Sequence, residues 1–172
     1  MEGVARNKVR LLPHSEEWEK EFLNVKKEIQ EVWGDIAIDI QHFGSTSIKN
    51  VYAKPILDVA VVVKSFHDMR PENLVDLGYE YIGPDYPALN RHLFVLRDEN
   101  DFSLRHIHCY EPNDENFSDC VKFRDYLNAH PDEAKAYSDL KIELEKKYAD
   151  DRYAFGNGKQ EFIQAIYKKI RS

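Results

Sequence analysis

The 172-residue sequence predicts an α+β fold, in which one helix precedes a mixed β-sheet of four or five strands and a helical C-terminal third follows. Three patterns lead to this prediction. Apolar residues recur every three or four positions near residue 20, they alternate or run continuously in the middle of the chain, and the helical period returns after residue 113. One domain over residues 1–172 is expected, because domains of about 150 residues are common.

A first helix is predicted over residues 13–33. Ser15 is a suitable N-cap residue, the glutamates after it suit the positive end of the helix dipole, and Gly34 is a typical end. An apolar stripe at helical spacing is expected to face the core. It consists of Trp18, Phe22, Val25, Ile29 and Val32.

Two strands are predicted on either side of a short polar loop. Residues 36–43 alternate between apolar and polar types, which is typical of a strand with one face in water. Residues 56–63 are apolar on both faces and rich in β-branched side chains, so they suit a central strand that is covered on both sides.

A short helix and a hairpin are predicted next. The helix is expected over residues 71–78, between a proline and a glycine, and a loop is expected over residues 86–90. Residues 91–98 and 103–111 have the composition of strands and are separated by a short polar turn.

Helices are predicted from residue 113 onward. After the first of them, a second is expected over residues 130–151, because Pro131 suits the first turn of a helix. A last helix is expected over residues 158–171, where apolar residues recur at every fourth position.

The charge and composition exclude several classes of protein. Lysine and arginine number 24 and aspartate and glutamate 31, which gives a net charge of −7. Without a basic tract, such a chain is not expected to bind nucleic acid in general or an anionic membrane. Its longest apolar run, residues 59–63, is far shorter than the ~20 residues that span a bilayer. Two cysteines and no recognisable signal peptide indicate a cytoplasmic protein.

The loop between the first two predicted strands has the sequence Gly44, Ser45, Thr46, Ser47. Glycine allows a ligand to approach the backbone closely, and consecutive N–H groups can hold an anion such as phosphate. The hydroxyl groups add further donors. The alternative is a turn that only caps the helical turn after it.

Asp58 is a carboxylate within an otherwise apolar strand. Burial of a carboxylate is unfavourable unless a partner compensates its charge. Lys54 would form a structural ion pair with it, whereas a bound cation would give it a functional role. The sequence leaves both interpretations open.

His106 and His108 form a second candidate feature. Side chains alternate across a strand, so these two histidines share one face and Arg105 lies on the other. Two imidazoles at this spacing can bind one metal ion or share a phosphate. The alternative is that they are hydrogen-bonding groups of the core. The candidate catalytic and metal-binding residues are therefore Asp58, His106 and His108.

Three cationic residues are candidates for neutralising phosphate charge, and Arg124 and Lys159 are further cationic candidates outside that set. Lys54 is close in sequence to Asp58, and Arg91 and Arg105 lie on the two strands that would line a common site. The alternative for each is a solvated surface charge. Together with the loop residues 44–47, Lys54, Arg91 and Arg105 make up the predicted phosphate-binding set.

Four stretches of the chain resemble the GrpB-like family in order and spacing. They are "HFGSTSIKNVYAKPILDV", "RHIHCYE", "KFRDYLNAHPDEAKAYSDLK" and "KQEFI", and the resemblance covers most of the chain. It implies a nucleotidyltransferase-like mixed β-sheet flanked by helices. The same family also occurs as a C-terminal domain of some bacterial dephospho-CoA kinases.

The resemblance also implies roles for individual residues. In the nucleotidyltransferase superfamily a Gly-Ser loop holds the triphosphate, and an Asp-x-Asp/Glu pair on the next strand binds divalent ions. Gly44 and Ser45 match the loop, and Asp58 matches the first carboxylate. Ala60 stands at the second carboxylate position, which puts the usual two-metal arrangement in doubt.

Two functions are compatible with these features. The first is an enzyme that uses a divalent metal (Mg²⁺, Mn²⁺ or Zn²⁺) to transfer a nucleotidyl or phosphoryl group to a small acceptor. One carboxylate with two imidazoles suits Mn²⁺ or Zn²⁺ better than Mg²⁺, which prefers oxygen ligands. The second is a non-catalytic module that binds a nucleotide or another phosphorylated small molecule. The acceptor and the oligomeric state are left open.

Overall fold

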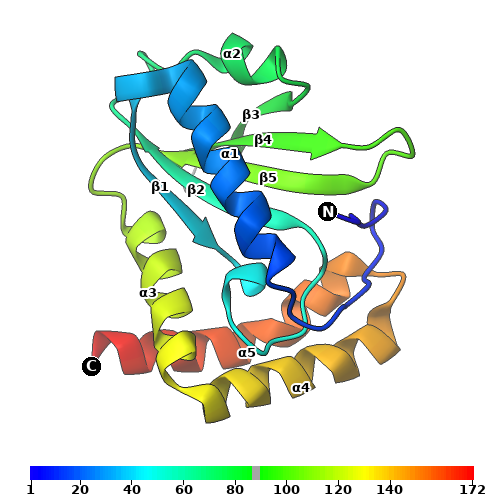
Figure 1. Cartoon of the computed structure of the whole chain (residues 1–172). Helices are drawn as coiled ribbons and strands as arrows, with labels where there is room; N and C mark the ends of the chain where they lie inside the picture. Colours follow the sequence, from blue (N-terminus) through cyan, green and yellow to red (C-terminus); the bar gives the residue numbers. More distant parts are fainter. Residues whose placement is uncertain (87–89) are drawn as a thin grey trace.

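The computed structural model describes residues 1–86 and 90–172 (Figure 1). A five-stranded sheet in the order β1-β2-β5-β4-β3 confirms the predicted α+β class. The strands are β1 (Ala37–Phe43), β2 (Leu57–Val63), β3 (Glu80–Tyr86), β4 (Arg91–Arg97) and β5 (Ser103–Tyr110). The helices are α1 (Glu17–Trp33), α2 (Pro71–Val75), α3 (Glu115–Ala129), α4 (Pro131–Tyr148) and α5 (Arg152–Arg171).

One strand pair makes the sheet mixed. β2 and β5 run parallel, with Asp58 paired to His106, whereas the other neighbouring strands are antiparallel. β2 is buried along its length except at Asp58, as its apolar sequence predicts for a central strand. The predicted hairpin of β4 and β5 is also confirmed.

Helix α1 lies across one face of the sheet (Figure 1). Its buried residues are Trp18, Phe22, Val25, Ile29 and Trp33. The predicted stripe is thus confirmed except that Val32 is only partly buried and Trp33 takes the last core position. Ser15 Oγ accepts a hydrogen bond from Glu17 N at 3.2 Å, but Glu16 rather than Ser15 occupies the N-cap position, and the Glu16 side chain makes no capping bond.

Helix α3 packs on the opposite face of the sheet at its β1 end, and α4 and α5 lie beyond the end of the sheet (Figure 1). Phe43, Ala60 and Tyr110 form an apolar cluster there, against which Phe117 of α3 packs. A second cluster joins the segment after β1 to the C-terminal helices. Its buried members are Ile48, Val51, Leu127, Ala134, Tyr137 and Ile166. These contacts place α4 and α5 beside the loop that follows β1 (Figure 1).

Strand β3 is a difference from the prediction, which assigned residues 80–86 to no strand. Gly83 and Pro84 weaken the sequence signal, but β3 is an edge strand with irregular pairing, where such residues are tolerated. Helix α2 ends at Val75 rather than near residue 78. The loop predicted over residues 86–90 falls mostly outside the described residues.

Helix α5 begins at Arg152, earlier than the predicted start at Gly158. Gly156 and Gly158 are poor helix formers, yet the helix continues through both. Gly158 has a packing role, because a Cβ atom at this position would overlap the Leu144 side chain of α4. Close packing of α4 and α5 therefore depends on that glycine.

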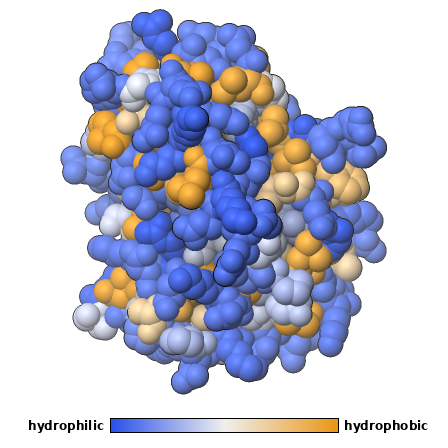
Figure 2. Space-filling model, viewed as in Figure 1, coloured by the Kyte–Doolittle hydropathy of each residue, from blue (hydrophilic) through white to orange (hydrophobic). Residues whose placement is uncertain are grey.

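The surface is mainly polar, as expected for a chain with 32% charged residues. Figure 2 shows hydrophobic residues on this side of the molecule in small separate groups. Among the described residues, no helix combines the length and the apolar character needed to cross a membrane.

Candidate functional site

The candidate site lies where β1 ends, beside the first residues of β2. Asp58 pairs in register with Phe43 of β1 on one side and with His106 of β5 on the other. Asp58 Oδ1 is 3.3 Å from His108 Nε2 and 3.7 Å from His106 Nδ1. The predicted trio therefore converges, with one ligand atom of each residue within 4.8 Å of the others.

The pKa of the Asp58 carboxyl group is shifted by its neighbours. Burial alone would raise its pKa, but the hydrogen bond from His108 and the charges of His106 and His108 (when protonated) and of Lys54 together lower the pKa below its usual value. No ion pair joins Asp58 directly to Lys54 in the described residues. The simple structural salt bridge is thus not what compensates this charge.

The two histidines differ in their surroundings. Burial lowers the pKa of His106 to about 4, partly offset by Asp58, so its imidazole is neutral near neutral pH. His108 Nδ1 is buried and has no hydrogen-bond partner among the described residues. Metal-bound histidines normally donate their second ring N–H to an acceptor. Among the described residues, no acceptor is found for the second ring nitrogen of either histidine.

Gly44 is required by its contact with Asp58. Its φ of 71° and ψ of −175° lie in a region that essentially only glycine occupies. A Cβ atom at this position would lie 2.7 Å from Asp58 Oδ2. The loop can therefore pass directly over the carboxylate only because residue 44 has no side chain.

The loop after Gly44 forms a short 3₁₀ turn, Ser45–Ser47. The amides of Ser47 and Ile48 are used within the turn, donating to Gly44 O and Ser45 O. The amides of Ser45 and Thr46 make no hydrogen bond within the described residues. Two of these four amides are thus satisfied within the turn, and the phosphate-binding role of the loop stays a prediction.

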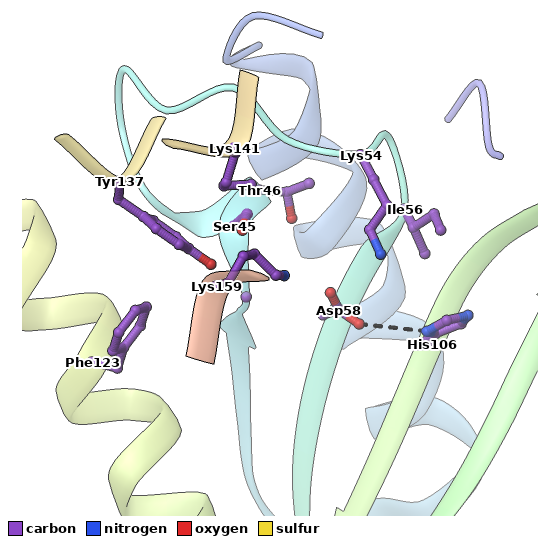
Figure 3. A pocket seen from close by; sticks show the side chains of 11 residues that line it. Ser45, Thr46, Lys54, Ile56, Asp58, His106, Phe123, Tyr137, Lys141 and Lys159 are labelled. Carbon is purple, nitrogen blue, oxygen red and sulfur yellow. Dashed lines mark ion pairs between the residues drawn. The ribbon is translucent and has the colours of Figure 1, made fainter. Parts of the chain in front are cut away.

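A cavity of about 240 Å³ opens between this loop, β2 and the C-terminal helices (Figure 3). Among the predicted site residues, Gly44, Ser45, Thr46, Lys54, Asp58 and His106 line it. The other lining residues are Ile56, Phe123, Tyr137, Lys141 and Lys159. The Thr46 hydroxyl is engaged with His42 Nε2 at 2.8 Å, and Ser47 Oγ donates to Gly44 O, so Ser45 is the hydroxyl best placed for a ligand.

Three lysines give the cavity its positive charge. Lys54 and Lys159 both place their ammonium groups over the buried Phe155 ring, at 5.7 and 4.9 Å from its centroid. Burial, then the charges of Lys159 and Arg152, lower the pKa of Lys54 to about 7. A single carboxylate, Asp58, faces these lysines in the cavity lining.

Lys141 is the most unusual of the three, because it is only 1% exposed. Its Nζ donates to Tyr52 O at 2.7 Å and lies 5.1 Å from the centroid of the Tyr137 ring. Burial, followed by repulsion from Lys159 and Lys54, holds its pKa well below the usual value. An anion in the cavity would relieve this repulsion.

Three predicted phosphate-binding residues, Ser47, Arg91 and Arg105, do not line the cavity. Arg105 lies on the opposite face of β5, as the alternation predicts, and forms ion pairs with Glu21 and Glu28 of α1. Arg91 interacts with the hydroxyl of Tyr110, the last residue of β5. Their placement gives neither arginine a direct contact with a ligand in this cavity.

The sequence interpretation did not identify Lys141, although a signal was present. Lys141 follows Tyr137 by four residues and Ala134 by seven, so it falls on the apolar face of α4. A lysine on the buried stripe of an amphipathic helix is uncommon, since lysine is rarely buried without a partner. That position indicates a functional cation.

The burial of His42 predicts a pH dependence of stability. Burial lowers the pKa of His42 to about 4, whereas in the unfolded chain it titrates near 6.5. The unfolded state therefore binds more protons between these values, and the free energy of unfolding falls by roughly 3 kcal/mol as the pH falls from 6.5 to 4. Urea unfolding across this range should show a smaller loss for His42→Gln. Equal losses in His42→Gln and the exposed-site control His67→Gln would contradict this assignment.

Comparison with known proteins places the chain in a family. The model of the GrpB protein family matches residues 8–169. The chain is 34% identical to the glutamate-rich protein GrpB of Alkalihalophilus pseudofirmus, over 99% of this chain and 100% of that protein. It is 25% identical to a dephospho-CoA kinase of Mycolicibacterium paratuberculosis, over 96% of this chain but only 47% of the kinase.

Solved structures agree with this assignment. The crystal structure of GrpB from Enterococcus faecalis matches with a TM-score of 0.84 and 26% identity, covering 94% of this chain and 96% of that one. The Cid1 poly(U) polymerase with bound MgGTP matches with a TM-score of 0.53 and 12% identity, covering 78% of this chain and 43% of the polymerase. That second likeness shows a nucleotidyltransferase-like fold and no more. The chain belongs to the GrpB family.

Proposed function

We propose that this chain binds the phosphates of a nucleotide in the lysine-lined cavity and transfers a nucleotidyl or phosphoryl group to a small acceptor. One observation carries the proposal: Lys54, Lys141 and Lys159 converge beside the Gly44 loop and next to Asp58. Lys141 is buried and the other two lysines are partly buried, and neighbouring cations in such surroundings are unfavourable in the absence of an anion. The available amides of Ser45 and Thr46 add donors for the same anion.

A divalent metal fits part of this site. Asp58 Oδ1 and His106 Nδ1 approach one another closely enough to share an ion, and His108 Nε2 would be a third ligand. This donor set suits Mn²⁺ or Zn²⁺ better than Mg²⁺. When bound, such an ion would supply charge stabilisation at the reacting phosphate.

The proposed reaction is an in-line displacement. An acceptor hydroxyl oxygen attacks the α-phosphorus, the bond to the bridging oxygen breaks, pyrophosphate leaves, and the acceptor proton is released to water. Lys54, Lys141 and Lys159 would stabilise the charge that builds up on the departing phosphates. The Gly44 loop would hold the nucleotide phosphates next to Asp58.

A non-catalytic binding module is the second candidate, and Ala60 favours it. Ala60 stands where the superfamily has its second carboxylate, and it is fully buried in the cluster with Phe43 and Tyr110. No second oxygen ligand can come from this position. Such a module would use the same lysines to bind a nucleotide without transferring any group.

Thermal unfolding with ATP and Mn²⁺ tests both candidates. At a hundredfold excess over Kd, ligand binding stabilises the folded state by about 2.7 kcal/mol, which is about 5–10 °C for a chain of this length. We expect this shift in the parent protein and its loss in Lys159→Met. The control Lys168→Met removes an exposed lysine from the same helix and should retain the shift.

Release of pyrophosphate or phosphate separates the enzyme from the module. The assay uses ATP with Mn²⁺, Zn²⁺ or Mg²⁺ and either water or glycerol as acceptor. Release that disappears in Asp58→Asn supports transfer, whereas binding without release supports the module. Both candidates are wrong if none of the four common ribonucleoside triphosphates stabilises the parent protein with any of these ions.

A further inference from the structure

A second cavity begins at His106, on the side away from the lysines. Its volume is about 360 Å³. His106 is the one described residue that lines both this groove and the lysine-lined cavity. The groove lining is completed by Arg6, Asn7, Ile82, Leu93, Val95, Arg97, Ser103 and Arg152. A molecule in the groove would therefore lie directly beside the candidate reaction centre.

The floor of the groove is apolar and belongs to the sheet. Val95 pairs in register with His106, and Leu93 pairs with His108, so both lie on the same sheet face as the histidines. Val95 is buried, while Ile82 at the outer end is 44% exposed. Such a floor suits the apolar body of a small molecule.

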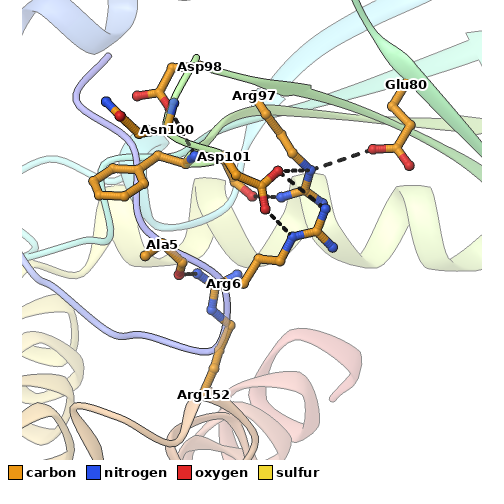
Figure 4. A network of polar contacts seen from close by, with 10 residues as sticks. Ala5, Arg6, Glu80, Arg97, Asp98, Asn100, Asp101 and Arg152 are labelled. Atoms are coloured by element: carbon orange, nitrogen blue, oxygen red, sulfur yellow. Dashed lines mark hydrogen bonds and ion pairs between the residues drawn. The ribbon is translucent and has the colours of Figure 1, made fainter.

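The walls of the groove carry arginines, two of which are already paired. Arg6 contacts Asp101 at 2.5 Å, and Arg97 lies 3.5 Å from Glu80 and 3.8 Å from the same aspartate. Figure 4 shows this network, with Arg152 on the other side of Arg6. The paired arginines form a wall that is held in place but is nearly neutral.

Arg152 differs from them because it has no carboxylate partner among the described residues. Its Nη2 donates to Ala5 O at 2.9 Å, and its Nε donates to Lys8 O at 3.1 Å. These bonds to main-chain carbonyls orient the guanidinium without neutralising its charge. An oriented, half-buried and uncompensated guanidinium is well suited to bind a carboxylate or a phosphate.

We infer that this groove binds the acceptor, and that the acceptor is a small acid with an apolar body whose anionic group contacts Arg152. The claim that the bound acid is the acceptor rests on the proposed function. The claim that the groove binds an acid rests on Arg152 and the apolar floor alone. The acid would lie over Leu93 and Val95, with its reactive end toward His106. Nucleotide and acceptor would then approach the reaction centre from opposite sides of that histidine.

Calorimetric titration with three probes tests the inference. Inorganic pyrophosphate reports on the lysine-lined cavity, while phenyl phosphate and benzoate report on the groove and distinguish a phosphate from a carboxylate. We expect one of the aryl acids to bind protein already saturated with pyrophosphate, in the millimolar range typical of molecules this small. Arg152→Met should weaken aryl acid binding by at least about tenfold and pyrophosphate binding far less. Lys159→Met should show the reverse pattern.

A second pair of variants tests the apolar floor. Ile82→Glu places a negative charge at the exposed end of the groove and should also abolish aryl acid binding. Its control is Ile38→Glu, which alters an equally accessible isoleucine on the opposite edge strand. Failure of both aryl acids to bind, or their displacement by pyrophosphate, would overturn the inference. If pyrophosphate and ATP do not bind but an aryl acid binds through Arg152, the groove stands and the proposed function fails.

Discussion

Replacement of Gly44 by alanine should destabilise the protein and abolish nucleotide binding. The backbone conformation at residue 44 costs a non-glycine residue about 1–3 kcal/mol, and the new Cβ would meet Asp58 Oδ2 at 2.7 Å. The loop must then move away from Asp58, which separates the available amides of Ser45 and Thr46 from the lysines. Urea unfolding and the ATP-induced thermal shift measure the two effects.

A double-mutant cycle isolates the contact with the carboxylate. In an Asp58→Ala background, the Cβ introduced by Gly44→Ala no longer meets a carboxylate oxygen, so the stability lost through that substitution should fall by about 1 kcal/mol or more. Gly156→Ala is the matched control, because a Cβ at that helical position has no neighbour within 4 Å. It should be neutral or stabilising. Equal losses in both backgrounds would show that the close approach to Asp58 does not matter.

Replacement of Lys141 by methionine should have opposite effects on stability and binding. Burial disfavours the charged form of Lys141, as its lowered pKa indicates, so an apolar side chain of similar length should stabilise the fold where packing is retained. Loss of the hydrogen bond to Tyr52 O offsets part of that gain. We therefore expect a higher unfolding temperature for Lys141→Met together with pyrophosphate binding weakened by at least about tenfold.

The pH dependence of stability provides an independent check on Lys141. Because its pKa is lowered in the folded state, the unfolded chain binds more protons at pH values above that lowered pKa and up to about 10.5. The free energy of unfolding of the parent protein should therefore rise with pH over this interval, and less steeply for Lys141→Met. A variant that is less stable than the parent, or that binds pyrophosphate as tightly, would refute a binding role for this lysine.

The sequence predicts the positions of those site residues that follow from strand geometry. Alternation along β5 is enough to place His106 and His108 on one face and Arg105 on the other. The continuous apolar run around Asp58 predicts a central strand, and centrality implies a neighbour on each side. The pairing of Asp58 with His106 needs one further fact, the parallel register of β2 and β5. Strand periodicity alone does not supply that register.

The helical contribution to the site was less accessible to sequence reasoning. Lys141 and Lys159 become neighbours of Asp58 because α4 and α5 pack beneath the loop after β1. Which face of a C-terminal helix meets that loop is decided by tertiary packing, and a lysine at a helix position usually indicates a solvated charge. Arg152 lay outside the helix predicted over residues 158–171, so sequence reasoning offered no ground for placing it beside the sheet.

The parallel pairing of β2 with β5 determines when the binding site forms as the chain folds. Residues 64–102 separate these strands, and Lys159 follows β5 by about fifty residues, so the site depends on contacts between distant segments. Non-local parallel pairing is slow, and during synthesis β2 leaves the ribosome well before β5 and α5 are available. Ligand affinity should therefore appear only after α5 has packed, and a nucleotide can stabilise the finished fold without guiding its earlier steps.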